Sequence, residues 1–142
     1  MTVCEVKEYF RQIRKEQLEI NHLAEMIQHE ELTLLPKAVT YDKDKVQMSP
    51  EDILARSAAE IVEMQEELGR SIMILKRKKA GAEAMIIKLE NSDEREVMRY
   101  YYLDSIKGRL FRWDDVADKM HKDRRQIFRI HGNALKNLSQ TI

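Results

Sequence analysis

Basic side chains are concentrated near the C-terminus of this 142-residue chain. Residues 119–142 hold six lysines and arginines against one acid, Asp123, whereas residues 1–90 hold 14 basic and 17 acidic residues. The formal net charge of the whole chain is zero, so the positive charge is local. Ammonium, guanidinium and amide groups gathered in this way can neutralise phosphates and donate hydrogen bonds to flat polar edges. The candidate side chains are Arg112, Lys122, Arg124, Arg125, Gln126 and Arg129.

Helical periodicity predicts the element that positions these side chains. A C-terminal helix over about residues 123–138 turns apolar residues to one side at 100° per residue, namely Ile127, Ile130, Ala134 and Leu138. Its opposite face carries Lys122, Arg125, Arg129 and Lys136, with Gln126 and Phe128 at the edges. A shorter helix is predicted over residues 113–120, with Val116, Ala117 and Met120 inside, and residues 121–123 form a tight junction. This order of elements is typical of a helix–turn–helix.

A helix–turn–helix gives the basic cluster a purpose, because its second helix presents N-terminal side chains to the major groove of DNA. Arginine and lysine can read guanine, glutamine can read adenine, and both cations neutralise phosphate. Arg124 and Arg125 lie on the first helical turn, Arg112 is placed for the DNA backbone, and Asp123 is expected to cap the helix. The alternative is a helical bundle whose cations form only a solvated face.

Two long amphipathic helices are predicted upstream of this motif. The first covers residues 3–34, has apolar residues seven apart and is expected to stop at Pro36. The second covers about residues 50–90, repeats the same spacing and starts with Ser49 as its cap, while Gly81 could break it. A polar connector, residues 36–49, joins them. Residues 1–90 therefore read as a long helical hairpin that could pair protomers or bind a partner protein.

The remaining signals complete an all-α fold with a small C-terminal domain over residues 91–142. Asn91 or Ser92 is expected to cap a helix that extends to about Leu103. Residues 104–112 are expected to form a loop that turns at Gly108. Tyrosines 100–102 and Trp113 are expected to pack in the core of this domain, and the alternative is that they stack on bases. His131 is expected to be a packed or capping histidine, and the alternative is a contact with the DNA backbone.

Motifs for catalysis are missing from the sequence, so we expect no enzyme, metal or cofactor. His22 and His29 lack the further ligands that a metal site needs. The single cysteine, Cys4, excludes an internal disulfide, which fits a reducing cytoplasm. The N-terminus is charged too early for a signal peptide, and no apolar run approaches the roughly 20 residues of a membrane span. We therefore expect a cytoplasmic protein without membrane contacts.

Several motifs resemble the C-terminal part of phage transcription regulators of the RinA/ArpU type, over about residues 87–138. The matching segments are Glu94–Tyr102, Trp113–Ala117 and Arg125–Leu135, and the last, with its Ile-His-Gly-Asn-Ala-Leu run, is the most specific. The connector from Tyr41 to Pro50 is similar to that family as well. The resemblance implies a helix–turn–helix similar to region four of bacterial sigma factors, and a role in controlling phage or prophage late genes in a bacterial host cell.

The partners implied are double-stranded DNA and, at the long helices, RNA polymerase or a second protomer. Two alternatives stay open. A small terminase subunit would join a helix–turn–helix to oligomerising helices and bind a packaging site instead of a promoter. A coiled-coil adaptor would use its basic C-terminus only on acidic protein and would not bind DNA.

Overall fold

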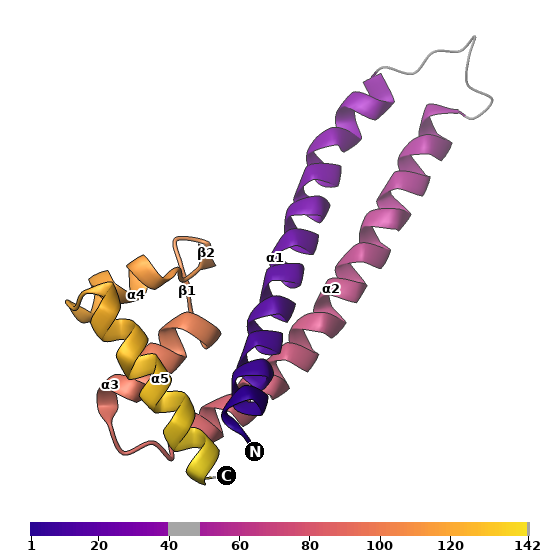
Figure 1. Ribbon diagram of the computed structural model, residues 1–142. Helices are drawn as coiled ribbons and strands as arrows, with labels where there is room; N and C mark the ends of the chain where they lie inside the picture. Colours follow the sequence, from indigo (N-terminus) through magenta and orange to yellow (C-terminus); the bar gives the residue numbers. More distant parts are fainter. Residues whose placement is uncertain (40–48, 142) are drawn as a thin grey trace. The chain divides into compact units, whose positions relative to one another are not determined.

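The computed structural model describes residues 1–39 and 49–141, which form helices and one small hairpin (Figure 1). In chain order the elements are α1 (Val3–Val39), α2 (Pro50–Ile86), α3 (Ser92–Met98), the π-helical turn η1 (Arg99–Leu103), β1 (Ser105–Ile106), β2 (Arg109–Leu110), α4 (Trp113–Met120) and α5 (Arg124–Thr141). The predicted all-α fold, with long helices before a small helical part, is confirmed. Most of the predicted connector, residues 40–48, lies outside the described residues.

The chain divides into two compact units, and each long helix contributes to both. One unit comprises residues 1–18 and 74–142, and the other comprises residues 19–73. The start of α1 and the end of α2 therefore belong to the same unit as the C-terminal helices. The assignment of separate roles to residues 1–90 and 91–142 stays a prediction.

In the unit of residues 19–73, the two long helices lie side by side and run antiparallel (Figure 1). Ile27 and Ile61, one from each helix, are buried there. Gln65 on α2 donates from Nε2 to Oε1 of Glu31 on α1 at 2.8 Å. The seven-residue apolar spacing accounts for this pairing because it keeps one apolar seam turned toward the neighbouring helix.

The end of α1 corrects the sequence-based boundary, because the helix passes through Pro36 and ends at Val39. Proline lacks one backbone donor and crowds the carbonyl four residues earlier, which costs about 3 kcal/mol. Residues that follow a proline can nevertheless keep helical dihedral angles, and α1 adds only three of them. The predicted stop at Pro36 was therefore wrong.

The start of α2 was predicted correctly, and its end was not. The Asp52 amide donates to Oγ of Ser49 at 3.2 Å, so Ser49 caps the helix. The helix continues through Gly81 and ends at Ile86, four residues before the expected end. A backbone hydrogen bond then spans three residues instead of the four of an α-helix, from the Leu89 amide to the Ile86 carbonyl at 3.0 Å.

Of the two caps predicted for α3, Asn91 or Ser92, the structure has Asn91, since its Oδ1 accepts from the amides of Asp93 at 2.8 Å and Glu94 at 3.3 Å. The helix widens into η1, where the Asp104 amide donates to the Arg99 carbonyl, five residues earlier, at 2.9 Å. Buried Glu94 accepts both of its 3.0 Å hydrogen bonds from Nδ2 of Asn137, which ties α3 to α5.

Residues 104–112 form a hairpin, where the sequence had predicted only a loop. Ile106 of β1 pairs with Arg109 of β2, and the turn between them consists of Lys107 and Gly108. Both turn residues have positive φ, 50° and 77°, as a two-residue hairpin turn of type I′ requires. The turn at Gly108 is thus confirmed, whereas strands of two residues were too short to show an alternating pattern.

A hydrophobic core lies within the unit of residues 1–18 and 74–142. Val97, Phe111, Val116, Ala117 and Ile127 form its buried cluster, and Tyr100, Tyr101, Ile106, Trp113, Met120 and Ile130 pack against it. The predicted inner faces of α4 and α5 are confirmed, since Val116, Ala117, Ile127, Ala134 and Leu138 are all buried. Val6, Phe10 and Ile13 of α1 are buried as well. Among the described residues, no helix has the combination of length and apolar content needed to cross a bilayer.

Candidate nucleic-acid interface

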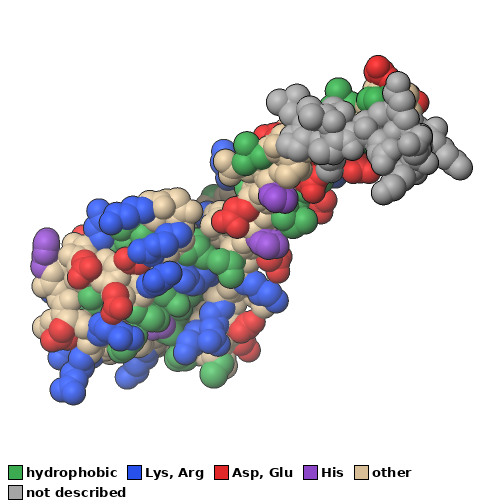
Figure 2. Space-filling model, turned by 90° about the horizontal axis from the view of Figure 1, so that it is seen from above, with side chains coloured by type: hydrophobic (Ala, Val, Ile, Leu, Met, Phe, Trp, Pro, Cys, Tyr) green, Lys and Arg blue, Asp and Glu red, His purple; other side chains and the backbone are tan. Residues whose placement is uncertain are grey.

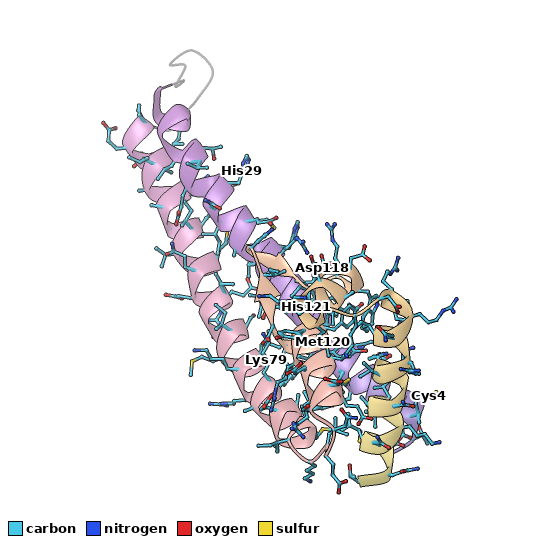
Figure 3. The ribbon with its side chains drawn as sticks, turned by 90° about the vertical axis from the view of Figure 1, so that its left-hand side faces the viewer. Cys4, His29, Lys79, Asp118, Met120 and His121 are labelled. Atoms are coloured by element: carbon cyan, nitrogen blue, oxygen red, sulfur yellow. The ribbon has the colours of Figure 1, made fainter. Side chains whose placement is uncertain are left out.

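Helices α4 and α5 are joined by the sharp turn that the sequence predicted. His121 follows the last residue of α4 in the left-handed conformation, with φ of 55°. The next amide, on Lys122, donates to the Ala117 carbonyl at 3.0 Å, which closes the helix end. Figure 3 labels Asp118, Met120 and His121 along this helix end and turn. The result is a short helix, a tight turn and a longer helix.

Asp123 caps α5, as predicted, and it does so together with Gln126. The Gln126 amide donates to Oδ1 of Asp123 at 2.8 Å, and the Asp123 amide donates to Oε1 of Gln126 at 3.1 Å. These reciprocal bonds form a capping box. The sequence predicted that Gln126 reads a base, and in the structure its side chain takes part in the cap of α5.

Two of the predicted cations are paired with acids of neighbouring elements. Nζ of Lys122 lies 3.8 Å from Oδ2 of Asp93 on α3. Nε of Arg124 lies 3.2 Å from Oδ1 of Asp114 on α4, and its guanidinium lies over the Phe128 ring at 5.5 Å. Solvent-exposed pairs of this kind contribute at most about 1 kcal/mol, so a phosphate can compete for both cations.

The other three predicted cations are exposed and make no ion pair within residues 1–39 and 49–141. They are Arg112, just before α4, and Arg125 and Arg129 on α5. Residues four apart lie on the same side of a helix, so Arg125 and Arg129 share one exposed face. On the face seen in Figure 2, Lys and Arg side chains gather over the unit of residues 1–18 and 74–142, with apolar side chains between them.

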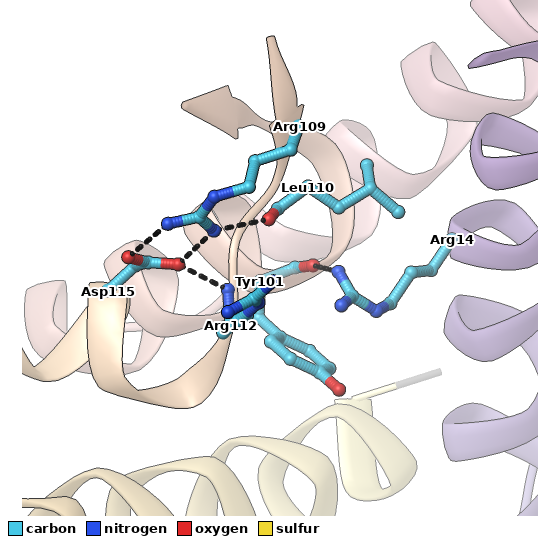
Figure 4. Close-up of polar contacts among 6 residues, drawn as sticks. All are labelled: Arg14, Tyr101, Arg109, Leu110, Arg112 and Asp115. Carbon is cyan, nitrogen blue, oxygen red and sulfur yellow. Dashed lines mark hydrogen bonds and ion pairs between the residues drawn. The ribbon is translucent and has the colours of Figure 1, made fainter. Parts of the chain in front are cut away.

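Arg112 is held at the start of α4 by an arrangement that sequence reasoning missed (Figure 4). Oδ2 of Asp115 accepts from the Arg112 amide at 2.8 Å, and Asp115 also accepts two bonds from the Arg109 guanidinium, at 2.5 and 2.9 Å. The Arg109 side chain, followed by the Arg112 amide, holds the pKa of Asp115 well below its usual range. An acid three residues after a helix cap was the sequence signal for this bond.

His131 is packed in the core, as predicted. Its Nε2 and the Tyr102 hydroxyl are hydrogen-bonded at 2.8 Å, and the Trp113 ring meets it edge-on at 4.8 Å between centroids. Burial, and then the positive charge of Lys7, lowers the pKa of His131 to about 4. His131 is therefore neutral near pH 7 and supplies no positive charge for binding phosphate.

The remaining histidines and the cysteine do not assemble into a metal site. His22, His29 and Cys4 are exposed, and Figure 3 shows His29 pointing away from the helix pair. Within residues 1–39 and 49–141, no three His, Cys, Asp or Glu side chains are placed together as metal ligands.

A groove beside α5 adds residues that the sequence did not bring together. It has a volume of about 670 Å³, and α1 forms one wall while η1, β2, α4 and α5 form the other. The α1 wall carries four cations, namely Lys7, Arg11, Arg14 and Lys15. Counted from Lys7, the other three lie four, seven and eight residues further along, which places all four on one side of a helix. Only the fold shows that this side of α1 lies beside Phe128 of α5.

A family model described as a protein of unknown function, DUF1492, matches residues 38–139, and the chain belongs to this phage-associated family. The match covers α2, α4 and all of α5 except its last two residues. No curated protein and no solved structure shows a significant match to the chain.

Proposed function

We propose that this chain binds double-stranded DNA in a sequence-specific manner and regulates transcription of phage or prophage late genes. The observation that carries the proposal is the exposed pair Arg125 and Arg129 on α5, at the second helix of a helix–turn–helix. Arg112 lies at the start of the first helix, where such motifs contact the DNA backbone. Membership of a phage-associated family supports the phage context.

In the proposed complex, the N-terminal half of α5 lies in the major groove. Arg125 donates two hydrogen bonds to guanine, and Gln126 reads adenine after releasing its bond to the Asp123 amide. Arg129, Arg112 and Lys122 neutralise phosphates, and Arg124 exchanges its bond to Asp114 for a phosphate. Breaking these ion pairs costs little free energy, because exposed pairs contribute little stability.

The regulatory role rests on the resemblance to RinA/ArpU-type regulators. The segment with the most specific similarity, Arg125–Leu135, falls on α5, and Glu94–Tyr102 falls on α3 and η1. We assign the paired long helices a role in assembly or in holding RNA polymerase. The protein acts by binding in the cytoplasm of a bacterial host, without catalysis.

Equilibrium binding to duplex DNA at two salt concentrations tests this proposal against a coiled-coil adaptor. We expect affinity to fall steeply between 50 and 200 mM salt, because bound phosphates release counterions. The double variant Arg125→Ala/Arg129→Ala should lose most of the affinity, whereas Lys88→Ala, which changes an exposed cation in the turn after α2, should not. Absence of wild-type binding at low salt would contradict the proposal, and a large ring in solution would favour a terminase subunit.

A further inference from the structure

The groove between α1 and α5 places four cations beside the proposed DNA-reading helix. Lys7, Arg11 and Lys15 follow one another at intervals of four residues, so they form a ladder on one side of α1. With a rise of 1.5 Å per residue, this ladder spans about 12 Å. All three side chains are exposed, and none makes an ion pair within the part of the chain that the structure describes.

The fourth cation, Arg14, fixes the ladder in place. Its Nη1 donates to the Tyr101 carbonyl at 2.9 Å, and its guanidinium lies over the Tyr101 ring, 4.1 Å from the centroid (Figure 4). The Tyr101 ring stacks in turn on Trp113 of α4, with centroids 3.7 Å apart and planes at 10°. α1 is thus attached to the helix–turn–helix through packed rings, and its cations keep a defined position beside α5.

The groove has a positive lining. Glu8 is its only acid, and Oε1 of Glu8 accepts a hydrogen bond from Gln12 at 2.7 Å. The charge of Lys7 also acts on the opposite wall of the groove, where it contributes to the lowered pKa of His131 on α5. The ligand that suits this lining is an anion with charges repeated along its length.

Two observations favour the backbone of duplex DNA as this anion. Among its predicted DNA contacts, the helix–turn–helix itself offers three cations that are unpaired within the described residues, Arg112, Arg125 and Arg129, because Lys122 and Arg124 must first give up their pairing with Asp93 and Asp114 before they bind phosphate. Specific DNA complexes commonly neutralise more phosphates than three cations can. The Tyr101 ring is also a poor platform for single-stranded bases, because it is covered by Arg14 on one face and by Trp113 on the other.

We propose that Lys7, Arg11 and Lys15 of α1 bind backbone phosphates of duplex DNA next to the site that α5 reads. The inference rests on the proposed function and extends it, because it turns the start of the first long helix into part of the DNA interface. Phosphate contacts carry no base information, so α1 strengthens binding to every sequence and sets the orientation of the protein on the duplex.

The triple variant Lys7→Gln/Arg11→Gln/Lys15→Gln of the full chain tests the inference. A 40-base-pair duplex of random sequence serves as the probe, and the binding constant is measured over a series of salt concentrations. We expect the slope of log K against log salt to decrease in magnitude by about 2 to 3, because each lost phosphate contact removes about 0.9. Affinity at 100 mM salt should fall at least about tenfold.

A matched control separates the groove from general charge. Arg70→Gln/Lys76→Gln/Arg77→Gln removes three exposed cations of α2 that do not line the groove, and it should leave the slope unchanged. Circular dichroism melting curves verify that all variants are folded.

The outcomes distinguish the inference from the function on which it rests. If Arg125→Ala/Arg129→Ala weakens binding while the α1 variant keeps the wild-type slope and affinity, the inference is wrong and the proposed function stands. That result would leave the groove, with Leu18 at 59% and Phe128 at 43% exposure, as a surface for an acidic protein segment. If the wild-type protein binds no duplex at all, both proposals fail.

Discussion

The guanidinium of Arg14 lies over the ring of Tyr101 and donates a hydrogen bond to the carbonyl oxygen of the same residue. One side chain of the first helix therefore holds both the ring and the backbone of η1, 87 residues later in the chain. Because Tyr101 stacks on Trp113, the contact extends to the first helix of the helix–turn–helix. The start of α1 is part of the proposed DNA-binding unit, and the following predictions test this arrangement.

Arg14→Ala should lower the free energy of unfolding by about 2 kcal/mol, since it removes a cation–π contact and a charge-assisted hydrogen bond. Urea denaturation followed by circular dichroism measures the change. Arg11→Ala is the matched control, because Arg11 is exposed on the same helix and should change stability by less than about 0.5 kcal/mol. Equal effects of both substitutions would show that Arg14 does not anchor α1.

The stability of the protein should decrease as the pH falls from 7 toward 4, in part because of His131. Burial and the charge of Lys7 lower its folded-state pKa to about 4, whereas the unfolded value is about 6.5. Between these values the unfolded chain binds the extra proton, so acid favours unfolding, by up to about 3 kcal/mol for this group.

His131→Gln should reduce this pH dependence, because glutamine offers the Tyr102 hydroxyl an acceptor and does not titrate in this range. Urea denaturation at pH 7 and at pH 4.5 gives the free energy of unfolding for both proteins. The same loss of stability in both would mean that His131 is not the group that titrates.

Gln126→Glu should separate the two roles of this residue. Glutamate at the third helical position preserves the capping box with Asp123, so thermal stability should be unchanged or slightly higher. A negative charge on the turn that is proposed to face DNA should nevertheless weaken duplex binding at least about tenfold. A variant that binds DNA as tightly as wild type would remove Gln126 from the interface.

Arg125→Ala should cost about 1–3 kcal/mol of specific binding if this side chain reads a base. Lys122→Ala should instead weaken binding to all sequences and reduce the salt slope by about 1, because it removes a phosphate contact. Competition between the target duplex and a scrambled duplex separates the two effects. An equal loss on both duplexes with Arg125→Ala would make Arg125 a backbone contact.

Local signals predicted the helix starts of this protein well. Ser49, Asn91 and Asp123 each accept the backbone bonds that a cap requires, and these bonds depend only on residues nearby in the chain. Pro36 misled the prediction because the cost of a proline within a helix is finite. The hairpin after Asp104 was missed because its strands are two residues long.

The candidate site was only partly predictable, because much of it depends on distant residues. Helical periodicity alone was enough to predict the exposed cations of α5. The pairing of Lys122 with Asp93, and of Arg124 with Asp114, required the packing of three helices. The contact of Arg14 with Tyr101 joins residues far apart in the sequence, and periodicity within one helix cannot reveal its partner in another element.

Selection of DNA fragments from a bacterial genome that carries this gene tests the central claim most directly. The purified full-length protein retains fragments at 150 mM salt, and sequencing compares them with the input and with those retained by Arg125→Ala/Arg129→Ala. We predict strong enrichment of a few fragments that share a common site beside prophage genes, and loss of this enrichment in the variant. Retained fragments that match the input, or equal enrichment by both proteins, would contradict sequence-specific binding by α5.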